Sequence, residues 1–109
     1  MRSVPFEIGG KMRHIRFDYN SICDVEEITG RDFMSLGGHS GTKFALWGGL
    51  KWEHRGLTPQ VVGNWIGEYL QSGGTWEELN SAIGKAIEQS GLYGTPPEDG
   101  DEGNEMAAE

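Results

Sequence analysis

Side chains that could do catalytic or metal chemistry are few and widely spaced along this chain. His14, His39 and His54 fall in an expected strand, a glycine-rich loop and a helix end, and none has a second histidine or a cysteine at metal-ligand spacing. Cys23, the one cysteine, lies in an apolar helical pattern without an adjacent base or cluster of positive charge. We therefore expect surface or loop histidines and a buried structural thiol. The sequence predicts no catalytic residue, no metal, no cofactor and hence no enzyme.

Residues 37–43, Gly-Gly-His-Ser-Gly-Thr-Lys, partly resemble a phosphate-binding loop. Such a loop needs the pattern G-x-x-x-x-G-K-[ST] between a buried strand and a helix, so that backbone N–H groups surround the phosphates. Counting from Gly37, Thr42 stands where the second glycine belongs and Phe44 stands at the Ser/Thr position. These mismatches argue against nucleotide binding. The segment instead indicates a flexible start of a helix, capped by Ser40 or Thr42.

The charge of the chain is concentrated at one end. The 109 residues carry a formal charge of −8, from nine basic and seventeen acidic side chains. Six of the acids lie in residues 95–109, which hold no Lys or Arg, so the remainder is nearly balanced. We predict one folded domain over residues 1–94 and a disordered acidic tail over 95–109. A balanced body with an acidic tail has no electrostatic reason to bind nucleic acid.

No stretch of the sequence predicts export or membrane insertion. The longest apolar run, residues 44–50, is far too short to span a bilayer. Pro5 and Glu7 interrupt the N-terminus before an apolar signal region develops. One cysteine also suits a reducing compartment. We expect a soluble protein of the cytoplasm with no membrane partner.

The first thirty residues predict a hairpin that runs directly into a helix. Residues 4–8 and 12–17 alternate apolar and polar side chains around a Gly9-Gly10-Lys11 turn. Asp18 is a suitable N-cap for the helix that follows, and Gly30 is a suitable C-terminal glycine. We expect this helix to bury its apolar side chains to varying degrees, namely Tyr19, Ile22, Cys23, Val25 and Ile28.

A second helix is expected over residues 42–54, apolar on nearly every side and therefore central in the fold. His54 would then be a cation near its C-terminus, where it complements the helix dipole. Gly48 and Gly49 should each cost about 1 kcal/mol relative to alanine inside this helix. Close approach of a neighbouring backbone, or a kink, would account for them.

Two further helices have clear start signals. Thr58 and Pro59 form an N-cap and first-turn pair, followed by an apolar stripe that ends before residue 72. Thr75 and Glu78 form a capping box for a last helix that ends at Gly91. The predicted fold class is therefore α+β, mostly α, with an N-terminal β-hairpin packed on a bundle of about four helices.

The aromatic content points to an interaction surface. Four tryptophans exceed what a core of this size requires, and tryptophan is enriched at interface hot spots. The surface around Phe44, Trp47, Trp52 and Trp65 is the predicted protein-binding site. The alternative, that all the tryptophans belong to the core, stays open.

Residues 4–70 resemble the small tail assembly chaperones of tailed phages, especially those of gene transfer agents. Three segments carry the resemblance, namely FEIGGKMRHIRFD, YNSICDVEEITG and FALWGGLKWEHRGLTPQVVGNWI. In the last of them an apolar helix that bears tryptophan, followed by charged residues, leads into a helix capped by Leu-Thr. None of these segments contains a catalytic motif.

The resemblance implies a non-enzymatic function in the host cytoplasm. Such a chaperone binds the long, helical tape measure protein, keeps it soluble and promotes assembly of the tail tube protein around it. Self-association into a homo-oligomer is also plausible for such a surface. The main alternative is a structural tail component, a tube or connector subunit retained in the virion. A small regulatory protein is a further alternative, supported only by size and acidity.

Overall fold

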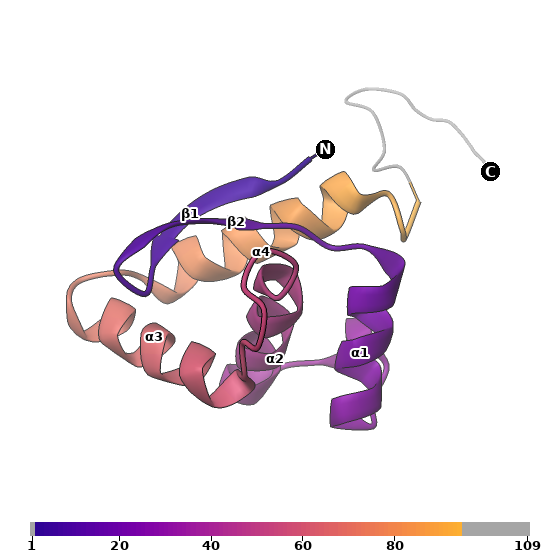
Figure 1. Ribbon diagram of the computed structural model, residues 1–109, viewed down its shortest axis with the longest axis horizontal. Coiled ribbons are helices and arrows are strands. Elements are labelled where there is room, and N and C mark those ends of the chain that lie inside the picture. The colour runs from indigo at the N-terminus through magenta and orange to yellow at the C-terminus, as the bar shows by residue number, and fades with distance from the viewer. Residues whose placement is uncertain (1, 95–109) are drawn as a thin grey trace.

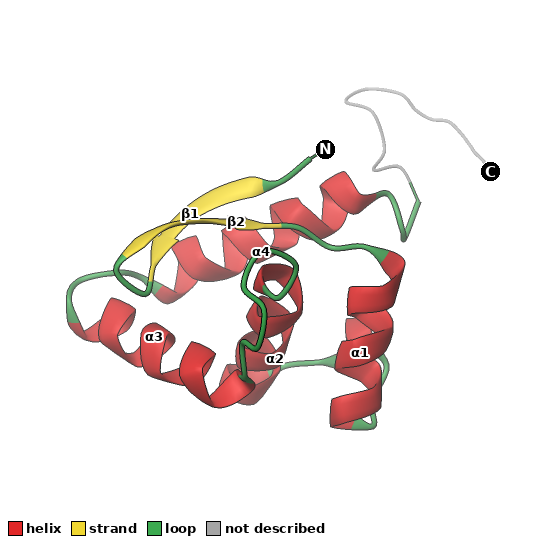
Figure 2. Cartoon of the chain, viewed as in Figure 1, coloured by secondary structure: helices red, strands yellow, loops and turns green. Residues whose placement is uncertain are grey.

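A computed structural model describes residues 2–94, and the predicted acidic tail, residues 95–109, lies outside the described residues. A two-stranded antiparallel hairpin packs on four α-helices, which confirms the predicted α+β, mostly α fold (Figures 1 and 2). The elements are β1 (Val4–Ile8), β2 (Lys11–Ile15), α1 (Tyr19–Thr29), the short 3₁₀ helix η1 (Phe33–Ser35), α2 (Gly38–Leu50), α3 (Pro59–Gln71) and α4 (Trp76–Ser90).

The hairpin closes through a two-residue turn of glycines. Gly9 and Gly10 have φ angles of 65° and 84°, which side chains with a Cβ rarely adopt. Two consecutive positive φ values are typical of the type I′ turn, whose twist matches that of the strands. Ile8 pairs with Lys11, so β2 begins at the residue assigned to the turn and ends at Ile15 rather than at residue 17.

Helix α1 has the predicted ends but buries fewer side chains than predicted. Its N-cap is Asp18 and its C-cap is Gly30, which has a φ of 70°. The prediction that Tyr19 and Ile28 are covered is wrong, because their exposed fractions are 69% and 50%. Cys23 is half-buried, so the expected buried thiol is also corrected. The helix lies at one side of the molecule and packs mainly on α2 and η1 (Figure 1).

Helix α2 begins at Gly38, four residues earlier than predicted. Its N-cap is Gly37, which makes no side-chain capping bond, so the expected cap by Ser40 or Thr42 is wrong. The glycine-rich segment is the first turn of the helix, and the Gly41 amide donates to the Gly37 carbonyl at 3.1 Å. The hydroxyl of Thr42 donates across to Asn80 of α4 at 2.9 Å, so it stabilises packing between helices instead.

The centre of the fold is α2, as predicted, with α1 on one side, α3 on the other, and the hairpin and α4 across its end (Figure 1). Gly48 and Gly49 allow this close packing. A Cβ at Gly48 would lie 2.5 Å from Cγ2 of Val25, and one at Gly49 would lie 2.6 Å from Cγ2 of Ile15. The amide of Arg16 also donates to the Gly49 carbonyl at 2.8 Å. The expected close approach of a neighbouring backbone is therefore found at Gly49, whereas at Gly48 the close neighbour is the Val25 side chain.

Helices α3 and α4 begin at the predicted caps, with one difference. Thr58 accepts a hydrogen bond from the Val61 amide, and Thr75 accepts one from the Glu78 amide at 3.0 Å. In the predicted capping box the Glu78 side chain would also accept a hydrogen bond from the Thr75 amide. The Thr75 amide instead donates to the hydroxyl of Tyr69 at 3.3 Å. That hydroxyl in turn contacts the Glu78 carboxylate at 3.2 Å.

Substitution by alanine should have opposite effects on the free energy of unfolding at Gly48, which is closely packed, and at Gly67, which is not. Gly48→Ala adds a methyl group where Val25 already lies, and overpacking of this kind costs about 1–3 kcal/mol. Gly67→Ala in α3 has nothing within 4 Å of the new Cβ, so it should stabilise by about 0.5–1 kcal/mol through helix propensity. Urea unfolding of both variants measures the difference. Equal stability of the two would contradict the packing role of Gly48.

Candidate functional site

The four predicted binding residues do not share one surface. Trp47 is only 8% exposed, and its indole N–H donates to the Leu57 carbonyl at 2.9 Å, so it belongs to the core. Trp52 is 39% exposed and lies against β2. Phe44 and Trp65 are half-buried and line two different grooves. A role of these residues in binding stays a prediction, and the two grooves are the candidate sites.

The first groove, here called the Leu36 groove, lies among α1, η1, α2 and α4. It consists of two hollows of about 410 and about 200 Å³ that share Leu36 and Gly41. Its apolar lining comes from all four elements and the loop before α2, namely Ile28, Phe33, Met34, Leu36, Phe44, Ala45, Ile83 and Ile87. The floor is formed by the well-packed ring of Phe33, which is 4% exposed and lies edge-on against Phe17 with ring centres 5.4 Å apart.

The rim of the Leu36 groove carries exposed apolar side chains, although Thr29, Ser40, Thr42 and Asn80 also line the groove. Met34 is 62% exposed and Ile28 is 50% exposed. Arg31 is the one charged side chain among the lining residues. Large apolar side chains exposed around a hollow are typical of a protein interaction site. Its chemistry suits the apolar face of an amphipathic helix.

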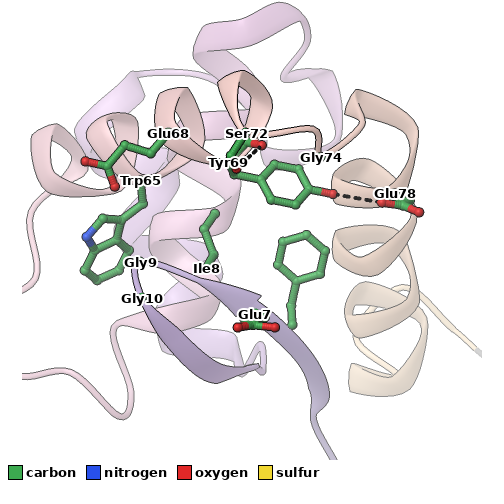
Figure 3. Close-up of a pocket in the computed structure, with 11 residues that line it drawn as sticks. Glu7, Ile8, Gly9, Gly10, Trp65, Glu68, Tyr69, Ser72, Gly74 and Glu78 are labelled. Carbon is green, nitrogen blue, oxygen red and sulfur yellow. Dashed lines mark hydrogen bonds between the residues drawn. The ribbon is translucent and has the colours of Figure 1, made fainter.

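The second groove, here called the hairpin groove, runs along β1. It consists of two hollows of about 530 and about 380 Å³ that share Glu78. One wall is residues 4–10, and the other is the end of α3 with residues 77–85 of α4. Figure 3 shows the larger hollow, with Trp65 beside the glycine turn and Tyr69 reaching toward Glu78.

A buried arginine fixes the turn end of the hairpin groove. Arg13 is 7% exposed, and its side chain donates to the carbonyls of Ile8 at 2.8 Å and Gly9 at 2.9 Å. Its guanidinium also lies 3.8 Å from the ring centre of Trp65. Gly9 packs so closely on this indole that a Cβ there would lie 2.6 Å from it. Arg13 lies on the buried face of β2 with Ile15, and nothing in the sequence indicated Trp65 as its partner.

The other end of the wall is held by Tyr69. Its ring packs on Phe6 with centres 5.2 Å apart, and its hydroxyl contacts both Thr75 and Glu78. Burial raises the pKa of Tyr69 above its ordinary value of 10.0, the backbone bond to Thr75 opposes the rise, and the nearby Glu78 carboxylate adds to it. The groove is negative, because its charged lining residues are Glu7, Glu68, Glu77, Glu78 and Lys85.

The remaining reactive side chains have ordinary packing partners. The ring of His39 packs on Trp76 with centres 4.3 Å apart, and His54 packs on Trp65 at 5.7 Å. Because α2 ends at Leu50, the expectation that His54 lies at its C-terminus is wrong. Within residues 2–94 no three His, Cys, Asp or Glu side chains are grouped to hold a metal ion. None of the helices in that range has the length and apolar character needed to cross a membrane.

Tyr69→Phe tests the link between α3 and α4. Losing the hydroxyl contacts should cost about 1 kcal/mol at neutral pH. Because the raised pKa favours the neutral phenol in the folded state, that stability is intact below the ordinary pKa of 10.0 and falls as pH rises above it. The variant should therefore lose stability less steeply in alkaline solution. Tyr19→Phe, at an exposed ring, is the control for thermal unfolding across this range.

Comparison with known proteins gives this chain no relative. No protein-family model, no curated protein sequence and no solved structure matches it. The structural argument for a function therefore uses the geometry and the lining residues of the two grooves.

Proposed function

We propose that this protein is a non-enzymatic tail assembly chaperone of a phage or gene transfer agent. It binds the tape measure protein and promotes tail tube assembly. The observation that carries the proposal is the Leu36 groove, a hollow of mixed lining whose rim exposes Ile28 and Met34 and whose floor is the buried ring of Phe33. The resemblance of residues 4–70 to that family supplies the identity of the partner.

The shape of the Leu36 groove suits a helical target. An amphipathic helix binds through apolar side chains spaced three or four residues apart, each of which needs a hollow. Phe44 lines one hollow, Ile83 and Ile87 line the other, and Leu36 contributes to both. Exposed Met34 adds a flexible side chain that adapts to different apolar partners. A long tape measure protein offers many such helical segments.

The charge of the chain fits a carrier of an aggregation-prone partner. A net charge of −8 keeps a complex in solution even while the carrier covers apolar surface. Assembly of this kind takes place in the host cytoplasm, with no nucleic acid and no membrane as partner. The apolar rim also allows a homo-oligomer when the tape measure protein is absent.

A structural tail component, such as a tube or connector subunit, is the alternative function. It is favoured by the same exposed rim, because Ile28 and Met34 would suit a permanent contact between neighbouring subunits as well as a transient one. The two functions differ in whether the chain stays in the finished particle.

Ile28→Asp and Met34→Asp should each weaken binding of the tape measure protein at least about tenfold. The charge is placed on a side chain that is already exposed, so the fold should persist. Met12→Asp, at a side chain 53% exposed on the hairpin, is the matched control and should bind normally. The measurement is a pull-down of the tagged chain from cells that produce the particles, with the tape measure protein quantified.

Purified particles, probed in parallel, separate the two functions. Recovery of the tape measure protein, with this chain missing from finished particles, supports the chaperone. Retention of the chain in particles would replace the chaperone with a structural tail component. A pull-down that recovers neither the tape measure nor the tail tube protein would refute both.

A further inference from the structure

The hairpin has two outer edges, and the strand register shows which backbone groups each presents. Ile8 and Lys11 flank the two-residue turn and form a hydrogen-bonded pair, so the pairs alternate from there along the strands. Glu7 with Met12, and Pro5 with His14, are therefore the pairs whose N–H and C=O groups point outward. Pro5 fits this register because it has no N–H to donate.

The outer edge of β2 is blocked by its own chain at His14 and Arg16, whereas within residues 2–94 the outward groups of Met12, next to the turn, have no such partner. The His14 amide lies 3.3 Å from Oε2 of Glu53, and the Trp52 indole N–H donates to the His14 carbonyl at 2.9 Å. The next outward amide, that of Arg16, donates to the Gly49 carbonyl at 2.8 Å. Side chains of the α2–α3 connection thus take the place of a neighbouring strand at this edge.

The outer edge of β1 is open. Within residues 2–94, the Pro5 carbonyl and both backbone groups of Glu7 have no hydrogen-bond partner. The hairpin groove runs along this same strand, with residues 4–10 as one wall. An unpaired strand edge beside a groove is the geometry in which an extended peptide adds a strand to a sheet.

A second copy of β1 is a poor occupant of this edge. An antiparallel pairing centred on Phe6 would place each Pro5 opposite the other copy's Glu7 and leave two carbonyls without a donor, whereas a strand without proline would leave one. A pairing centred on Glu7 would place two carboxylates directly opposite each other. The acidic residues 95–109 are equally unsuited, because the groove itself is lined by four glutamates and one lysine.

We infer that the β1 edge binds an extended segment of a partner protein that carries lysine or arginine side chains. The segment adds as a third strand beside β1 and bonds to the outward groups of Pro5 and Glu7. Because side chains alternate between the two faces of a strand, its basic side chains lie beside Glu7 on the outer face of β1, and the side chains between them face the aromatic rings of the groove. This site is separate from the Leu36 groove and does not rest on the proposed function.

The test uses the full ¹⁵N-labelled chain and a short synthetic peptide in which lysine alternates with valine. Amide chemical-shift changes should concentrate at residues 4–10 and along the α3–α4 wall, and hydrogen exchange of the Glu7 amide should slow at least about tenfold at saturation. A peptide with glutamate in place of lysine tests the charge. A peptide N-methylated at alternate amides tests the backbone bonds, and both should bind at least about tenfold more weakly.

Two charge-reversal variants complete the test. Glu7→Lys should weaken binding of the lysine peptide at least about tenfold. Glu27→Lys, at an exposed position on α1, changes the net charge equally and should leave binding unchanged. The inference is overturned by any of three results: no shift at about millimolar peptide, equal binding of the N-methylated peptide, or equal effects of the two variants. Because Ile28→Asp leaves this groove intact, failure here is distinguishable from failure of the chaperone function.

Discussion

The contact of Gly48 and Gly49 with their neighbours is the constraint on which the rest of the structure depends. The missing side chains let Val25 of α1 and Ile15 of β2 reach the backbone of α2, and the Arg16 amide bonds to the helix there. These contacts fix both the hairpin and α1 on the central helix. Since the Leu36 groove lies beside α1 and the hairpin groove beside β1, one pair of glycines sets the position of both sites.

Much of the fold could be predicted from the sequence because its signals are local. A glycine pair between alternating strands, Asp18 and Gly30 at the ends of α1, and Thr58 before Pro59 each act within one turn of backbone. The start of α2 was missed because glycine and serine favour loops, and the packing of the helix against its neighbours overrides that preference. The half capping box was missed because the Tyr69 hydroxyl comes from another helix.

The candidate sites were harder to predict, since a groove is made by elements far apart in the sequence. Aromatic residue types indicated a binding surface, but the same types also fill cores, and Trp47 does so here. Met34 and Leu36 are recognisable in the sequence as apolar residues of a connection, but no periodic pattern there predicts that they line a groove. Arg13 was equally unmarked, although it ties the glycine turn to Trp65.

The blocked outer edge of β2 limits how many strands the hairpin can accept. Trp52 and Glu53 occupy the His14 backbone groups, and a strand added to β2 would have Met12 alone to bond to in that strand, so the side of β1 is the better edge for an added strand. A hairpin that offers one edge for pairing cannot connect two other molecules through strand pairing on both of its sides. The hairpin would therefore be monovalent: it can pair with one extended segment on the side of β1 but cannot join two such segments, so it would cap one side of a sheet instead of linking two.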